Sequence, residues 1–204
     1  MASRNPDHDL MDSLKKIRKL DPDSAKILSK RLFNDTMVPA VGNKLAYDSF
    51  LSRPRGGVHV MIDGNDFGAI NKKWGQSMGD EAIKTIFNTV SRSSRKMRGK
   101  AFRVGGDEGR LHFDTPEQAH AFARDVRQNL ESIPPIKGQH GYSLSIGMGG
   151  SPEEAEKALI NAKNEKKSMN YPIGEAKTHI HSLLPKTSDP TPESADPVSK
   201  IGTL

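Results

Sequence analysis

The sequence predicts an α+β domain in which helices flank a central sheet that contains antiparallel strands. The apolar run 58–62 ends abruptly in Asp63, as a buried strand does at the edge of a sheet. A Gly-Gly-Asp-Glu turn at 105–108 lies between two short β-prone runs and indicates a hairpin. Helical apolar periodicity separates these strands, so the order is strand, helix pair, hairpin, helix, strand, helix rather than a simple βαβ repeat.

The N-terminal segment 1–34 predicts two helices that precede the domain. The first spans 7–20, and the stretch 21–24 ends it and caps a second helix that runs to about Phe33. The first helix has one continuous apolar stripe, made by Leu10, Met11, Leu14, Ile17 and Leu20. We therefore expect lead-in helices that pack on the domain or pair with a second copy, in preference to a basic arm for nucleic acid.

Residues 35–184 are expected to form the domain itself. Loop 34–44 leads into a short helix through Phe50, and the remaining elements follow in order: strand 58–63, a helical stretch 67–74, helix 79–95, hairpin 101–113, helix 116–130, strand 142–148 and helix 151–167. Beyond Pro185 the chain is mostly Pro, Ser, Thr, Asp and Lys with little to bury, so we expect a disordered tail at 185–204.

Composition limits the classes of function. The 204 residues include no cysteine, which excludes disulfides and Cys-ligated metal. There is no apolar run of the ~20 residues that a membrane span needs, and no apolar N-terminal signal, so we expect a cytoplasmic protein with no membrane partner. A net charge of +6 favours a polyanionic ligand, either nucleotide or nucleic acid.

The two candidate strand ends carry carboxylates. Asp63 ends one strand, and Asp107 and Glu108 occupy the tip of the neighbouring hairpin. Carboxylates on adjacent strands can hold a divalent metal under a nucleoside triphosphate. Gly105 and Gly106 leave room for phosphate beside the backbone and tolerate the positive φ of a tight turn. An ordinary hairpin turn is the alternative interpretation.

Residues 35–170 resemble the GGDEF family, the diguanylate cyclases, which join two GTP molecules into cyclic di-GMP on a polymerase-palm-like (ferredoxin-like) domain. The resemblance rests on blocks in the family's order: 35–45, 63–71, Gly79-Asp80-Glu81, the turn 105–108, Ser145-Ile146-Gly147 and 155–163.

The resemblance implies roles for individual residues. Asp63, the Gly64 carbonyl and Asp107 would bind Mg²⁺ or Mn²⁺, and Asp107 or Glu108 would help to deprotonate a 3′-hydroxyl. The implied nucleotide-binding residues are Asn71 and Asp80 for guanine, Lys163 and Lys167 for the β- and γ-phosphates, and also Phe67, Gly105 and Gly106.

Several positions depart from the family's pattern. Asn65 stands in place of a second Asp, Gly68 in place of a Lys, Gly109 in place of the Phe after the turn, and Lys167 in place of an Arg. The family's product-inhibition motif Arg-x-x-Asp would fall on 96–99, where Lys96 and Gly99 occupy its ends. The sequence therefore indicates a divergent member.

Three functions compete. The first is a divergent diguanylate cyclase-like nucleotidyltransferase that acts on GTP as a homodimer. The second is a degenerate GGDEF module that binds GTP or a cyclic dinucleotide without catalysis. The third is a palm-type polymerase or primase relative, supported by the basic run 92–103. Nucleic acid is not favoured, because aromatic residues make up only 5% of the chain and offer no stacking platform.

Overall fold

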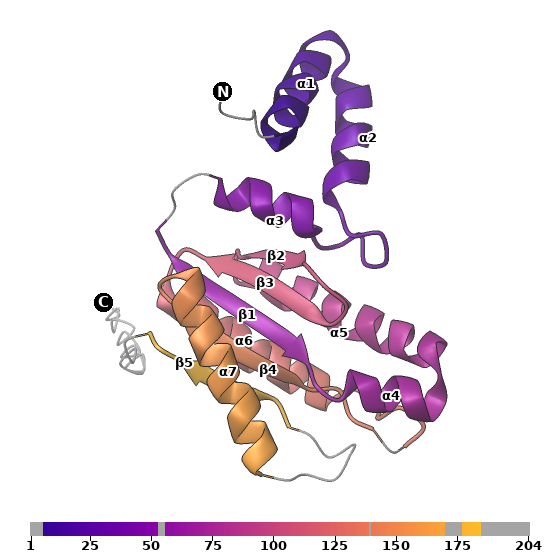
Figure 1. Ribbon diagram of the computed structural model, residues 1–204, viewed down its shortest axis with the longest axis vertical. Helices are drawn as coiled ribbons and strands as arrows, with labels where there is room; N and C mark the ends of the chain where they lie inside the picture. The colour runs from indigo at the N-terminus through magenta and orange to yellow at the C-terminus, as the bar shows by residue number, and fades with distance from the viewer. Residues whose placement is uncertain (1–5, 53–55, 139, 170–176, 185–204) are drawn as a thin grey trace, which may run out of the picture.

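A five-stranded mixed sheet forms the centre of the molecule. The computed structural model describes residues 6–52, 56–138, 140–169 and 177–184, so the predicted tail at 185–204 lies outside the described residues. The strands are β1 (Val58–Gly64), β2 (Lys100–Arg103), β3 (Glu108–Phe113), β4 (Leu144–Gly149) and β5 (His179–Ser182), in the spatial order β2-β3-β1-β4-β5. β1 is antiparallel to both of its neighbours, and β5 is parallel to β4. The predicted α+β class is confirmed (Figure 1).

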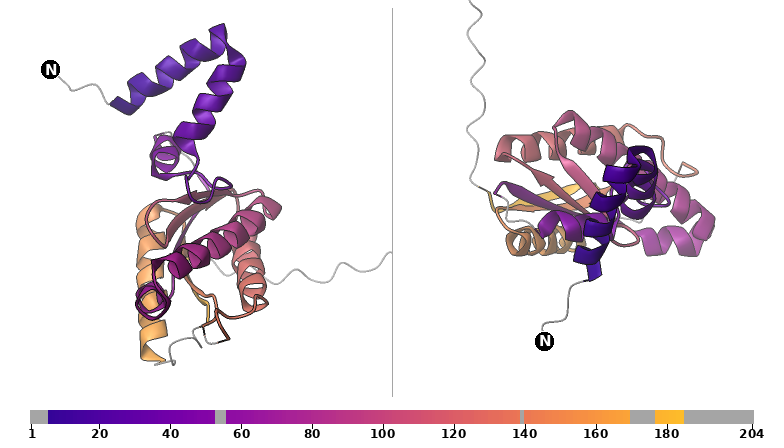
Figure 2. Two further views of the ribbon diagram at one scale, coloured as in Figure 1. Left: turned by 90° about the vertical axis from the view of Figure 1, so that its right-hand side faces the viewer. Right: turned by 90° about the horizontal axis from the view of Figure 1, so that it is seen from above.

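Helices cover both faces of the sheet. They are α1 (Pro6–Leu20), α2 (Pro22–Phe33), α3 (Lys44–Leu51), α4 (Phe67–Trp74), α5 (Gln76–Lys96), α6 (Pro116–Glu131) and α7 (Pro152–Ser168). α5 and α6 pack together on one face, and α7 lies on the other (Figures 1 and 2). Of the helices in the described ranges, none combines the length and the apolar character that crossing a membrane requires.

Alternation along β1 sets which side chains face which layer. Val60 and Ile62 are fully buried in the main core, which includes apolar residues of α5 and α6. Met61 instead packs with Ala155 and Leu159 of α7. Because Asp63 follows Met61 by two residues, its side chain points to the α7 layer at the end of the strand.

The structure differs from the predicted elements in three places. α5 begins at Gln76 rather than near residue 79. Gly75 is the single residue between α4 and α5, and its φ of +86° breaks the helix there, so α5 starts directly after it. β4 begins at Leu144, two residues later than predicted. The strand β5 was not predicted, since its four residues, His179–Ser182, depend on pairing with β4 rather than on a strong apolar pattern of their own.

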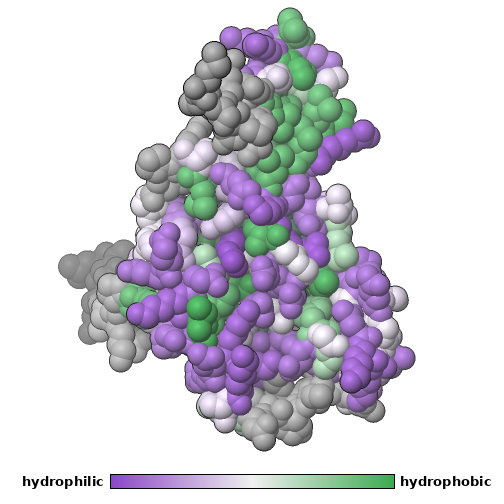
Figure 3. Space-filling model, viewed as in Figure 1, coloured by the Kyte–Doolittle hydropathy of each residue, from purple (hydrophilic) through white to green (hydrophobic). Residues whose placement is uncertain are grey.

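The lead-in helices form a hairpin that projects from the domain (Figure 2). α1 and α2 pack against each other, α2 contacts α3, and α3 contacts β2. Leu20, Ile27 and Leu28 are exposed, Leu20 with 87% of its surface, and apolar atoms gather on this hairpin in Figure 3. Residues of both helices also line a cavity of about 560 Å³. The domain therefore leaves apolar surface of the hairpin uncovered.

Candidate functional site

The two predicted metal-binding carboxylates lie on neighbouring strands. Asp63 pairs with Glu108 across β1 and β3, and Asp107 immediately precedes β3. The Gly64 amide donates a hydrogen bond of 3.0 Å to the Asp107 carbonyl, which ties the end of β1 to the turn. Both aspartates are half-buried, and Glu108 is exposed. The fold thus brings together Asp63, Gly64 and Asp107, as the resemblance implies.

The environment of Asp107 favours a positively charged partner. Burial raises the pKa of the Asp107 carboxyl above its ordinary value, and the nearby charge of Asp63 raises it further. The ammonium group of Lys163 acts in the opposite direction. Two carboxylates in a half-buried position repel each other unless a cation lies between or beside them.

Two lysines of α7 reach the segment that joins β1 to α4. Lys163 Nζ lies 2.6 Å from Asp63 Oδ2, and Lys166 Nζ lies 2.6 Å from Asp66 Oδ1. The spacing i,i+3 places both ammonium groups on one side of the helix. Lys167, which was predicted to act with Lys163, is exposed, so Lys166 is the second lysine that this face of α7 directs at the site.

The donor set fits a metal that arrives with its substrate. Within the described residues, no group of three or more His, Cys, Asp and Glu side chains is placed to hold a metal ion. Mg²⁺ commonly takes only one or two carboxylates and completes its shell with phosphate oxygens and water. Asp63 and Asp107 meet that requirement, and the ammonium of Lys163 already provides a cation at Asp63.

Glycine is required at position 64 for steric reasons. A Cβ there would overlap the ring of Phe67 and lie 3.1 Å from the Asp107 Cβ. Phe67 itself is buried in the core, so a nucleotide could meet only its backbone. This close packing holds the end of β1, the start of α4 and the turn in one arrangement.

The side chain of Asn65, which replaces the family's second Asp, is engaged in hydrogen bonds within the fold. It is buried, its Nδ2 donates to Ser143 Oγ at 3.0 Å, and its Oδ1 accepts from Ser145 Oγ at 2.9 Å. The backbone amide of Asn65 also donates to the Ser143 carbonyl. The side chain therefore ties β1 to β4 instead of facing the metal position. No sequence motif indicates Ser143, and Ser145 belongs to the Ser145-Ile146-Gly147 block only.

The Gly-Gly-Asp-Glu turn is stabilised by Arg103, a residue of the basic run 92–103. Arg103 Nε donates to the Gly106 carbonyl at 2.9 Å, and its Nη1 donates to both oxygens of Asp35 at 3.0 and 3.2 Å. Neither Gly105 nor Gly106 adopts the positive φ that glycine tolerates in a tight turn. A Cβ at Gly106 would meet only open space, which leaves its backbone accessible.

Gly109 stands where the family has a Phe, and neighbouring side chains fill the space. A Cβ at Gly109 would lie 2.7 Å from Ile62 and 3.0 Å from Phe87. The substitution therefore does not leave a hole beside the turn.

The two residues predicted to contact guanine lie on adjacent helices. Asn71 is exposed on α4, and Asp80 is half-buried near the start of α5. A Cβ at Gly79 would overlap the Asn71 amide oxygen, so Asn71 lies directly against the residue that precedes Asp80. The fold brings this pair together at the α4–α5 junction.

This sheet, with carboxylates at the meeting point of β1 and the β2–β3 turn, is the arrangement that the resemblance requires. Residues 44–169 match the family described as "Diguanylate cyclase, GGDEF domain", which covers more than half of the chain. The chain belongs to the GGDEF diguanylate cyclase family.

Relatives and solved structures agree with this assignment. The chain is 38% identical over 76 residues to the probable diguanylate cyclase DgcT of Escherichia coli (strain K12), a match that covers 36% of this chain and 17% of that protein. Its fold is similar to the coiled coil and GGDEF domain of DgcB from Caulobacter crescentus, solved with c-di-GMP. The TM-score is 0.61 at 16% identity, with 86% of this chain and 99% of that chain covered. A diguanylate cyclase/phosphodiesterase from Caldicellulosiruptor saccharolyticus gives a TM-score of 0.56 at 20% identity, with 68% and 91% covered.

Proposed function

We propose that this protein condenses two GTP molecules into cyclic di-GMP, or a related product, as a metal-dependent nucleotidyltransferase. The observation that carries the proposal is the convergence of Asp63 and Asp107 with the ammonium of Lys163 at the end of β1. Asp63 and Asp107 would hold Mg²⁺ or Mn²⁺ there, and the metal would supply positive charge that stabilises the negative charge developing at the α-phosphorus.

The side chains divide the work between phosphate and base. Lys163 exchanges its bond to Asp63 for the β- and γ-phosphates when nucleotide binds, and the open backbone at Gly106 lets the phosphates approach the turn. Asn71 and Asp80 read guanine, because an amide both donates and accepts and a carboxylate accepts from the ring N–H and the exocyclic amine.

The reaction needs two copies of the chain. One site holds one GTP, and the 3′-hydroxyl of each nucleotide attacks the α-phosphorus of the other. A P–O bond forms to the 3′-oxygen, the bond between the α- and β-phosphates breaks, and pyrophosphate leaves. Asp107 or Glu108 accepts the proton of the hydroxyl.

The lead-in hairpin is the proposed dimerisation element. Its apolar residues Leu20, Ile27 and Leu28 are exposed, and a symmetric contact with a second copy would bury them. Specific activity should therefore rise with protein concentration. Deletion of residues 1–33 should lower the activity per molecule without abolishing GTP binding.

A second candidate is a GGDEF module that binds nucleotide without turnover. Two observations favour it: Asn65 is engaged by Ser143 and Ser145, and Gly68 presents no side chain toward phosphate.

The deciding experiment is incubation of the protein with GTP and Mg²⁺ or Mn²⁺, followed by chromatography and mass spectrometry of the products. Asp63→Ala and Asp107→Ala should abolish product formation, whereas Asp48→Ala, which removes an exposed carboxylate on α3, should preserve it. Full activity of either site variant would refute the metal assignment. Saturable GTP binding without product at any protein concentration would instead support the binding module.

A further inference from the structure

Two charged residues of the basic run 92–103 form ion pairs with carboxylates. Arg103 is engaged by Asp35, and Lys96 Nζ lies 2.5 Å from Asp125 Oδ1. In the described part of the chain, Arg92 and Arg95 have no carboxylate partner within 4.0 Å, although both belong to the same run. No carboxylate therefore neutralises the charges of these two arginines within the described residues.

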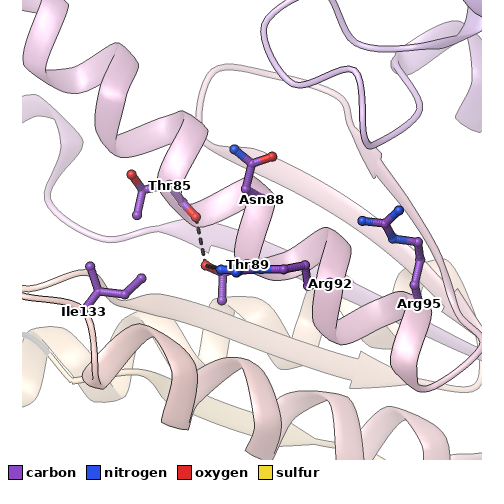
Figure 4. A pocket seen from close by; sticks show the side chains of 6 residues that line it. All are labelled: Thr85, Asn88, Thr89, Arg92, Arg95 and Ile133. Atoms are coloured by element: carbon purple, nitrogen blue, oxygen red, sulfur yellow. Dashed lines mark hydrogen bonds between the residues drawn. The ribbon is translucent and has the colours of Figure 1, made fainter.

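Arg92 and Arg95 line a cavity of about 480 Å³ on the outer side of α5 (Figure 4). The other lining residues are Thr85, Asn88, Thr89 and Ile133. The α5 residues follow one stripe of the helix at i, i+3, i+4, i+7 and i+10, and Ile133 comes from the segment after α6. A volume of this size falls within the range of about 300–1,000 Å³ that small-molecule sites occupy.

The side chains in the cavity are held by the helix itself. Arg95 Nε donates to the Ser91 carbonyl at 3.2 Å, and Arg92 Nη2 donates to Thr89 Oγ1 at 3.4 Å. Thr89 is buried and donates in turn to the Thr85 carbonyl at 2.9 Å. Each guanidinium thus keeps most of its N–H donors unused, and a guanidinium fork matches the geometry of a phosphate.

From these contacts we infer that the α5 cavity binds a small phosphorylated molecule such as a nucleoside monophosphate. The arginines bind the phosphate, because two cationic forks line the cavity and no carboxylate does. Asn88 offers a donor and an acceptor to the rest of the molecule, and Ile133 offers an apolar contact.

This cavity is separate from the proposed GTP site. Asp63 and Lys163 meet on the α7 side of the sheet, whereas α5 packs on the opposite face. A small ligand is favoured over single-stranded nucleic acid, because no aromatic side chain lines the cavity to stack on a base.

The test is an NMR titration of the isotope-labelled full chain with inorganic phosphate and, separately, with AMP. Amides of residues 85–95 and 133 should shift saturably, with AMP binding more tightly than phosphate. The same shifts should persist in Asp63→Ala, which removes a carboxylate of the GTP site. Arg92→Gln/Arg95→Gln should weaken binding roughly ten- to a hundredfold, the loss expected for charge-assisted bonds to phosphate.

The matched control is Arg98→Gln/Lys100→Gln, which removes the same charge from exposed positions of the same run. It should leave the affinity for AMP within about twofold, the change expected when only long-range charge is lost. Equal weakening by both double variants, or no saturable shift with either probe, would overturn the inference. Tighter binding of a single-stranded oligonucleotide than of AMP, with shifts extending to 98–100, would also overturn it in favour of a nucleic-acid surface.

Discussion

Removal of the Arg103 charge should destabilise the domain by about 3 kcal/mol. Arg103 and Asp35 keep only 13% and 10% of their side-chain surface exposed, and two hydrogen bonds join them. Breaking such a pair from one side leaves a buried carboxylate without a countercharge, which typically costs about 3–5 kcal/mol. The residual exposure places this pair at the lower end of that range. Arg103→Met keeps most of the apolar stem, so the variant isolates the loss of the charge and its hydrogen bonds.

Urea unfolding followed by circular dichroism measures this loss of unfolding free energy. In a separate thermal melt, the melting temperature should fall by about 6–12 °C for a chain of this size. Lys44→Met provides the control, because its partner Asp48 is exposed and such a pair contributes less than about 1 kcal/mol. Asp35→Asn should recover part of the loss in the double variant, since an amide oxygen can still accept from the Met37 and Val38 amides. A loss below about 1 kcal/mol for Arg103→Met, or strictly additive effects in the double variant, would refute the reasoning.

Four further predictions concern the pH dependence of Asp107 and the proposed nucleotide chemistry. Since burial and the charge of Asp63 raise the pKa of Asp107, metal-dependent GTP binding should weaken on acidification at a pH where an ordinary aspartate is still ionised. Acidification has the opposite effect on the free energy of unfolding, because the raised pKa of Asp107 means that the folded state binds this proton more tightly than the unfolded chain. The free energy of unfolding of the metal-free protein should gain a contribution as pH falls through the raised pKa, and Asp107→Asn should remove that contribution in a pH series of urea titrations. Calorimetry should show GTP binding roughly ten- to a hundredfold more tightly than ATP, because the Asp80 carboxylate would repel an adenine acceptor, and equal affinities would contradict its assigned role. Added cyclic di-GMP should not inhibit through the family's Arg-x-x-Asp site, since Gly99 lacks a carboxylate and Lys96 is engaged by Asp125, so strong non-competitive inhibition in a rate assay would contradict this.

Local pattern was enough to predict most of the elements. Helices with a continuous apolar stripe and a clear stop signal, such as α2 and α6, end within one residue of the predicted position. Thr115 forms a capping box with Gln118 at the start of α6, which is the kind of signal that sequence carries directly. β5 could not be predicted in the same way, because its pairing with β4 is a long-range contact.

Only those residues of the candidate site that belong to sequence motifs could be predicted. The sequence motif named Asp63 and Asp107, and the sheet register explains why they meet. It did not reveal that Lys166, rather than Lys167, would turn toward the segment after β1, because that depends on how α7 is rotated against the sheet. Nor did it reveal Asp35 as the partner of Arg103, since the two residues are joined only through tertiary packing.

The attachment of the α1–α2 hairpin has a mechanical consequence. Asn43 donates from its backbone to the Phe33 carbonyl and from its side chain to the Leu32 carbonyl, so the end of α2 is fixed to the start of α3. Gly42 bonds to β2 through both its amide and its carbonyl, and Asp35 is joined through Arg103 to the carbonyl of Gly106. These hydrogen bonds connect the base of the hairpin to the turn that contains Asp107, so we expect a rotation of the hairpin to displace that turn. A partner that reorients α1 and α2 would then also move the backbone beside Asp63 and Asp107.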